Sequence, residues 1–116
     1  MIIKNIQDVP AVPVNMEGAE NVQVRVIYGP KDKAPTFAMR VFELAPGGHT
    51  PYHQHNFEHE VLVLDGQIAA VTPDGPKPLK PRDTLLIPAN ETHQFKNLSD
   101  TNPAGFMCLV PIEYQK

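Results

Sequence analysis

Short apolar runs separated by prolines, glycines and polar turns dominate the pattern of hydrophobic and polar positions along this chain. The clearest run covers residues 59–64, is rich in β-branched side chains and ends at Asp65-Gly66, which predicts a buried strand and then a hairpin. In a regular strand, the odd-numbered residues of this run face one way and the even-numbered ones the other. Seven runs predict strands over 21–28, 37–45, 60–64, 67–71, 84–87, 93–97 and 105–110.

Thirteen prolines and seven glycines, spread along the 116 residues, leave almost no window long enough for a stable helix. The fold is therefore predicted to be all-β, and this many short strands with regular turns is typical of a sandwich or a barrel. The length and a hydrophobic content of 41% suit one domain with one core. Residues 1–20 contain two prolines and are expected to form an extended arm that pairs with a neighbouring subunit.

Charge and targeting signals exclude several classes of partner. The net charge is −3 and the ten basic residues are scattered, so neither nucleic acid nor a membrane surface is an expected partner. Residues 1–8 are interrupted by polar side chains before a signal-peptide core could form, and no stretch approaches transmembrane length. A single cysteine, Cys108, excludes an internal disulfide, and a cytoplasmic location is expected.

Four of the five histidines have the spacing of a metal site. His53 and His55 form a His-x-His pair, which places both rings on one face of an extended segment, and His59 has the same parity at the start of the next strand. His93 follows much later, in a turn rich in Asn and Thr before another strand. These four residues are predicted to bind a metal ion, whereas His49 is expected to be an ordinary surface or core residue.

These histidines belong to a longer pattern that resembles the paired signature of the cupin superfamily. His59 stands where the first motif of that family has a glutamate. In the second motif, Arg82 replaces the first glycine and Asn90 the second, and asparagine is the next best residue for a left-handed turn position. The positions that carry the resemblance are Gly47, His53, His55, His59, Gly66, Pro88, His93 and Asn97.

The run 56–64 and the segments 1–4, 37–40 and 108–111 are similar to those of the small four-histidine manganese cupins. This resemblance implies a double-stranded β-helix (jelly-roll) cupin barrel over 37–110 within a single domain of residues 1–116. It also implies a homodimer and one divalent metal ion held by four imidazoles, with two adjacent positions open. Manganese is the expected metal, and iron, zinc, nickel and copper are the alternatives, because imidazole affinity alone favours the later metals.

Four further residues are candidates for a substrate pocket. Arg40 lies in a strand that should line the barrel, where it either points inward and binds an anionic substrate group, as a catalytic residue, or lies exposed outside. Phe95, Phe106 and Cys108 either form an apolar wall near the metal or belong to the core. Nothing in the motif supplies a base or a positive charge to Cys108, so it is not expected to act as a nucleophile.

Glu58 and Glu60 have two possible roles, either as acceptors for the ring N–H groups of ligating histidines or as outward, solvated charges. The preferred function is a small metalloenzyme of oxidoreductase or dioxygenase type that acts on a small organic molecule inside the barrel. The alternatives are a non-enzymatic, metal-dependent module that binds or senses a small ligand, and a Lewis-acid isomerase or lyase. Because imidazole must be neutral to bind metal, metal loss is expected below about pH 6.5.

Overall fold

The computed structural model describes residues 1–115, and almost all of its regular structure is β. The helical elements are single 3-10 turns, η1 (Ile6–Asp8), η2 (Pro30–Asp32) and η3 (Ile112–Tyr114). No helix among the described residues is long and apolar enough to cross a membrane. The strands are β1 (Val12–Pro13), β2 (Glu20–Tyr28), β3 (Phe37–His49), β4 (His59–Asp65), β5 (Ile68–Thr72), β6 (Gly75–Leu79), β7 (Thr84–Ile87), β8 (Gln94–Asn97) and β9 (Ala104–Pro111).

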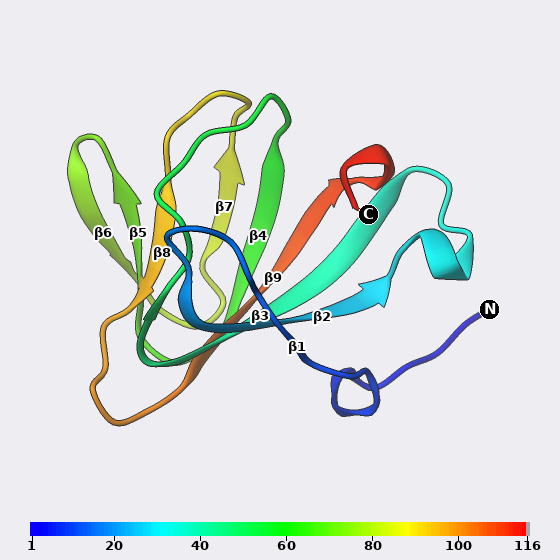
Figure 1. The fold of residues 1–116 in the computed structure, drawn as a ribbon, viewed down its shortest axis with the longest axis horizontal. Helices are drawn as coiled ribbons and strands as arrows, with labels where there is room; N and C mark the ends of the chain where they lie inside the picture. The colour runs from blue at the N-terminus through cyan, green and yellow to red at the C-terminus, as the bar shows by residue number, and fades with distance from the viewer. Residues whose placement is uncertain (116) are drawn as a thin grey trace.

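The strands form one antiparallel sheet in the order β6-β5-β8-β3-β9-β4-β7, with β2 on β3 and β1 on β2. The sheet curls into a jelly-roll barrel, which confirms the predicted fold class. In Figure 1, β2, β3 and β9 run as long ribbons to one side, and β5 and β6 lie on the opposite side. Strand β3 pairs with β9 along most of its length and with β8 only at His49↔Lys96, so its last residues join the two halves of the barrel.

The Asp65-Gly66 turn does not form the predicted hairpin. Strand β4 pairs with β7 and β9, whereas β5 pairs with β6 and β8, so the chain crosses here from one half of the barrel to the other. Gly66 has a φ of +82°, and a Cβ added to it would lie 2.5 Å from the Cβ of Ala104. The glycine is therefore required by a tight crossing. The real hairpin is the next one, where Thr72 pairs with Gly75.

Strand β6 was not predicted from the sequence, because it contains Pro76 and Pro78. It lies at the end of the strand order, and proline is tolerated on an edge strand, where its missing N–H has no partner to lose. The seven predicted strands agree with the structure except at their boundaries. The largest difference is in β3, which continues four residues beyond 45 to His49.

The barrel interior is apolar, and β4 shows the predicted alternation, with His59 and Val63 buried and Glu60 exposed. The core consists of Val22, Ala38, Leu44, Val61, Val63, Ile68, Ala70, Ile87, Phe95, Ala104, Phe106, Cys108 and Val110.

Part of the N-terminal arm folds back on its own chain, because Val12 pairs with Val24 of β2. Pairing of this arm with another subunit stays a prediction.

Asn97, the last residue of the resembling motif, ties three segments together from a buried position. Its amide nitrogen donates to the carbonyl oxygens of Leu44 (3.2 Å), Ala45 (3.1 Å) and Asn102 (2.8 Å). Its side-chain oxygen accepts from the backbone nitrogen of Ser99 at 2.9 Å. The amide therefore fixes the end of β8 against β3 and the loop that leads to β9.

Candidate metal centre and its cavity

Backbone hydrogen bonds bring the two histidine-bearing segments together. The backbone nitrogen of His53 donates to the carbonyl of His93 (3.1 Å), and the nitrogen of His93 donates to the carbonyl of His53 (2.9 Å). The nitrogen of Asn90 donates to the carbonyl of His55 at 2.7 Å. Asn90 has a φ of 67°, the left-handed conformation that its motif position predicts. Residues some forty positions apart are thus held in register before any metal binds.

Three of the predicted ligands, His53, His55 and His93, each offer a ring nitrogen within 4.8 Å of the others. The Nδ1 atom of His55 lies 2.8 Å from the carbonyl oxygen of Phe57, and Nδ1 of His93 lies 2.8 Å from that of Glu91. A carbonyl only accepts hydrogen bonds, so Nδ1 carries the proton and Nε2 keeps its lone pair. Nε2 of His55 is buried without a hydrogen-bond partner, as expected for an atom that binds a metal ion.

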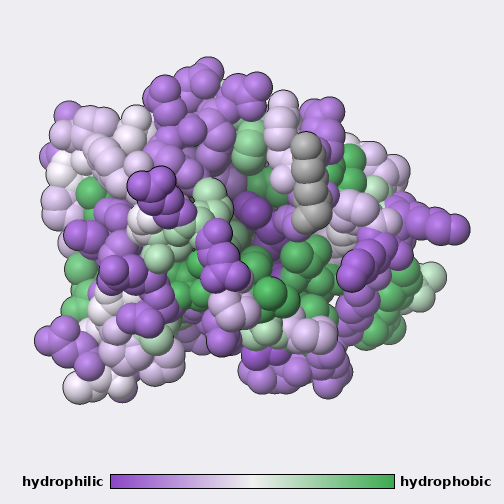
Figure 2. Space-filling model, viewed as in Figure 1, coloured by the Kyte–Doolittle hydropathy of each residue, from purple (hydrophilic) through white to green (hydrophobic). Residues whose placement is uncertain are grey.

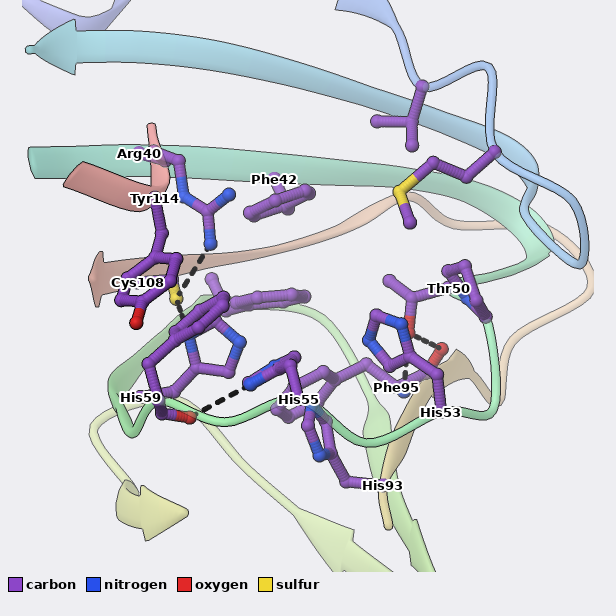
Figure 3. A pocket seen from close by; sticks show the side chains of 15 residues that line it. Arg40, Phe42, Thr50, His53, His55, His59, His93, Phe95, Cys108 and Tyr114 are labelled. Atoms are coloured by element: carbon purple, nitrogen blue, oxygen red, sulfur yellow. Dashed lines mark hydrogen bonds between the residues drawn. The ribbon is translucent and has the colours of Figure 1, made fainter. Parts of the chain in front are cut away.

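His59 lies beside this group, but its ring nitrogens are not within 4.8 Å of all three of the other histidines' ligand atoms. Its ring centroid is 4.4 Å from that of His55 and 5.5 Å from that of His93, and only 7% of the residue is exposed. Its Nδ1 atom lies 3.0 Å from the sulfur of Cys108. Figure 3 shows the His59 ring between Cys108 and the other imidazoles. A set of three or four imidazoles fits a borderline divalent metal such as zinc, iron, nickel or copper.

Burial favours the neutral imidazole at His53, His55 and His59. It lowers the pKa of His59 from 6.5 to about 3, and the positive charge of Arg40 adds to this effect. The pKa values of His53 and His55 are also lowered, again mainly by burial and then by neighbouring charges. Neutral rings have a free lone pair, so the site is ready to bind a metal ion at neutral pH.

A cavity of about 350 Å³ opens over these histidines, at the small end of the range for ligand sites. No Asp or Glu is among the residues that line it in the described chain. On the face seen in Figure 2, apolar residues gather around the middle and polar ones surround them. The lining residues are Val14, Met16, Arg40, Phe42, Thr50, Pro51, His53, His55, Phe57, His59, His93, Phe95, Phe106, Cys108 and Tyr114.

The structure places Arg40 in this cavity, where it has no carboxylate partner among the described residues. Its Nη2 atom lies 3.4 Å from the sulfur of Cys108, and its guanidinium carbon lies 4.9 Å from the ring centroid of Phe42. Its Nε atom is buried without a hydrogen-bond partner. The guanidinium is therefore a partly buried positive charge that the protein itself does not neutralise.

Cys108 is in a more polar environment than its sequence neighbours indicate. The motif was expected to supply no base or positive charge to Cys108, and this expectation was wrong, because both Arg40 and His59 contact the thiol. Burial nevertheless raises the pKa of the thiol, and Arg40 opposes that rise only in part. The thiol is therefore neutral at physiological pH, and a nucleophilic role stays unexpected.

Two aromatic residues at the cavity were not singled out from the sequence. Phe57 stacks on His55, with ring centroids 4.0 Å apart, and Tyr114 of η3 stacks on Phe57 at 4.1 Å. The spacing of Phe57, two residues after His55, was a usable signal because it gives both residues the same parity. Tyr114 carried no such signal, since it reaches the cavity from the far end of the chain.

The remaining polar candidates lie away from the metal centre. Glu58 and Glu60 are exposed, and two of the acceptors that hold the histidine rings are backbone carbonyls instead. His49 lies outside the histidine group, with Nε2 3.6 Å from a carboxylate oxygen of Glu20. This arrangement supports the interpretation that the two glutamates are outward charges and that His49 lies outside the metal centre.

Residues 40–110 match the family model described as the cupin domain. A 1-methylthio-D-xylulose 5-phosphate methylsulfurylase of Rhodospirillum rubrum is 35% identical over 81 residues, covering 70% of this chain and 51% of that protein. Auxin-binding protein 1 of Arabidopsis thaliana is 31% identical over 107 residues, covering 83% of this chain and 52% of that protein. The chain thus spans about half the length of these curated relatives.

Solved structures agree with the match to the cupin domain. The polyketide cyclase RemF from Streptomyces resistomycificus has a TM-score of 0.92 and 31% identity, covering 100% of this chain and 82% of that one. A cupin-2 domain protein of Rhodospirillum rubrum has a TM-score of 0.83 and 26% identity, covering 99% and 77%. The names of these relatives describe different activities, so the reaction has to be argued from the cavity of this chain.

Proposed function

Because this chain belongs to the cupin family, we propose that it is a metal-dependent enzyme whose cavity binds a small organic anion. The observation that carries the proposal is the charge of the cavity, which is lined by Arg40 and four histidines but by no carboxylate of the described residues. An unpaired buried charge is costly, and a divalent metal ion held by neutral imidazoles would add two further positive charges. An anionic substrate supplies the missing negative charge.

His53, His55, His59 and His93 would hold the metal, and manganese is the expected ion by resemblance. When bound, a divalent metal supplies a Lewis acid and, for manganese or iron, redox chemistry. Arg40 would bind the carboxylate, enolate or phenolate group of the substrate, while the aromatic walls exclude water and orient a planar molecule. This division of labour suits a small enolisable or aromatic acid.

Two reaction classes fit this cavity. An oxidoreductase of dioxygenase type is the first, by resemblance to the manganese cupins. The second is a Lewis-acid cyclase, isomerase or lyase, which the 31% identity and 82% coverage of the polyketide cyclase favour. The metal distinguishes them, because the first requires a redox-active ion and the second does not. A non-enzymatic binding module is the alternative to both classes, and the 31% identity of Auxin-binding protein 1 over 83% of this chain favours it.

The first test is elemental analysis of tag-free protein purified without added metal, by inductively coupled plasma mass spectrometry. We expect close to one divalent metal ion per chain. Manganese or iron would support the dioxygenase class, and zinc or nickel the Lewis-acid class. A folded protein that binds no divalent metal, even after incubation with manganese, iron, zinc or nickel, would refute the metalloenzyme.

Calorimetric titration with matched ligands tests the charge argument. Benzoate and benzamide have the same shape but differ in charge, so we expect benzoate to bind at least ten-fold more tightly. Arg40→Gln should remove that preference and Arg40→Lys should retain part of it. Arg82→Gln, an exposed arginine outside the cavity, is the control. Equal binding of the two ligands to the unmodified protein would contradict the proposal.

Two expectations about the whole protein remain predictions. The homodimer implied by the resemblance would be seen as twice the chain mass of 12.9 kDa in size-exclusion chromatography with light scattering. A cytoplasmic, reducing location agrees with Cys108, which is buried and free. Cell fractionation tests that location.

A further inference from the structure

Cys108 lies at the centre of three neighbouring strands. In β9 it is paired directly with Arg40 of β3 on one side and with Val61 of β4 on the other. His59 lies two residues before Val61 and therefore on the same face of β4. The register of the sheet thus directs the arginine, the thiol and the imidazole into the same cavity.

The sulfur of Cys108 joins the other two side chains. It lies 3.4 Å from Nη2 of Arg40 and 3.0 Å from Nδ1 of His59, and Figure 3 shows both contacts as dashed lines. A guanidinium can only donate, so the sulfur is an acceptor toward Arg40. The carbonyl oxygen of Leu109, 3.8 Å from the sulfur, is available to accept the single thiol proton.

This assignment determines the tautomer of His59. If the thiol proton is directed to Leu109, the short contact with Nδ1 requires the imidazole to donate. Nδ1 then carries the ring proton, and the Nε2 lone pair is free for a metal ion.

We propose that Cys108 is a positioning residue of the metal centre, whose thiol accepts hydrogen bonds from both His59 Nδ1 and Arg40 Nη2. It would fix the metal-binding tautomer of the histidine and the orientation of the anion-binding arginine. This role rests on the proposed function for its importance to metal binding, but the hydrogen bonds exist without a metal ion.

A thiol suits this position better than the carboxylate that often holds a ligating histidine. A carboxylate beside Arg40 would neutralise the guanidinium and would compete with an anionic substrate. A neutral thiol orders both donors and leaves the positive charge of the cavity available.

The tautomer can be read directly in metal-free protein, by long-range ¹H–¹⁵N correlation spectra of the histidine side chains. We expect His59 to carry its proton on Nδ1 in the unmodified protein and in Cys108→Ser, which keeps an acceptor. In Cys108→Val, which has a similar shape but no acceptor, the Nε2-protonated form should gain population. Protonation of Nε2 in the unmodified protein, or the same tautomer in Cys108→Val, would overturn the proposal.

Titration with Co²⁺ gives a second readout. Loss of a residue that orients a ligand typically weakens metal binding 10–100-fold, so we expect such a loss in Cys108→Val and recovery in Cys108→Ser. Val110→Ala is the matched control, because Val110 is equally buried on the same face of β9 but does not line the cavity. Its affinity should stay within two-fold of the unmodified protein, and a comparable loss there would count against a specific role.

The spectrum of the Co²⁺ protein separates this role from direct ligation. An intense near-ultraviolet sulfur-to-cobalt band would show that Cys108 binds the metal itself, and would refute a role through His59. If the unmodified protein binds no Co²⁺ at all, the proposed metal function fails. The tautomer measurement still decides whether the thiol orients the histidine, so the two failures are distinguishable.

Discussion

The buried imidazole of His59 should make the stability of the metal-free protein depend on pH. Its pKa is lowered from 6.5 to about 3 in the folded state, whereas in the unfolded chain it keeps its ordinary value. The folded protein therefore disfavours the imidazolium, and the unfolded chain takes up the proton first as the pH falls. The stability is complete above pH 6.5 and is lost progressively as the pH falls toward 3.

The size of this effect follows from the shift. One pKa unit corresponds to about 1.4 kcal/mol, so the loss approaches about 5 kcal/mol at low pH and reaches about 3 kcal/mol at pH 4.5. A domain of this size has a total stability on the order of 5–15 kcal/mol. His59 alone should therefore lower the free energy of unfolding by a large fraction between neutral pH and pH 4.5.

Urea unfolding of chelator-treated protein from pH 7.5 to 4.5 measures this free energy. His59→Asn is the reference, because its amide nitrogen can replace Nδ1 as a donor to Cys108 but does not titrate. The variant should be less stable at pH 7.5, because the smaller side chain leaves a cavity, yet its stability should fall by about 3 kcal/mol less on acidification. Parallel curves, whose separation stays constant within about 0.5 kcal/mol from pH 7.5 to 4.5, would refute the burial argument.

Other positions give sharper structural tests. Gly66→Ala should destabilise by more than about 3 kcal/mol, because its Cβ would meet Ala104 at 2.5 Å, whereas Gly75→Ala, with φ +107° but open space around it, should cost about 1–2 kcal/mol in thermal or urea unfolding. Asn97→Ala should cost about 2–3 kcal/mol in the same assay, because three backbone carbonyls lose their donor. The metal-loaded protein should retain its metal below pH 6.5, because burial lowers the pKa of three of the histidines. This differs from the expectation for unperturbed histidines. Dialysis at a series of pH values followed by elemental analysis measures the pH at which half of the metal is lost.

Local patterns in the sequence were enough for the strands and for the histidine group. Strand parity placed His59 and Val63 on the inner face, because side chains alternate with a period of two whatever the strand pairs with. His53 and His55 could be paired in the same way from spacing alone. These predictions depended on backbone geometry over a few residues, which the sequence specifies directly.

Strand partners are a different matter, because a turn signal shows that the chain reverses but not which strand it then joins. The Asp65-Gly66 pair has the composition of a hairpin, yet β7 and β9 occupy the two sides of β4, so β5 pairs with β6 and β8 instead. The prolines of β6 caused a strand to be missed, since proline excludes a central strand but not an edge strand.

The electrostatic character of the cavity is the property that could least be predicted from the sequence. Arg40, Cys108 and His59 lie up to 68 positions apart in sequence, and each alone has an ordinary explanation as a surface charge, a core residue or a ligand. Together they form a cationic wall to which no carboxylate in residues 1–115 contributes. The family determines the barrel, but an arginine opposite a neutral thiol is a property of this pairing of β3 with β9. Specificity within a shared fold is therefore best sought in such cross-strand pairs, which a change of one residue can alter without disturbing the barrel.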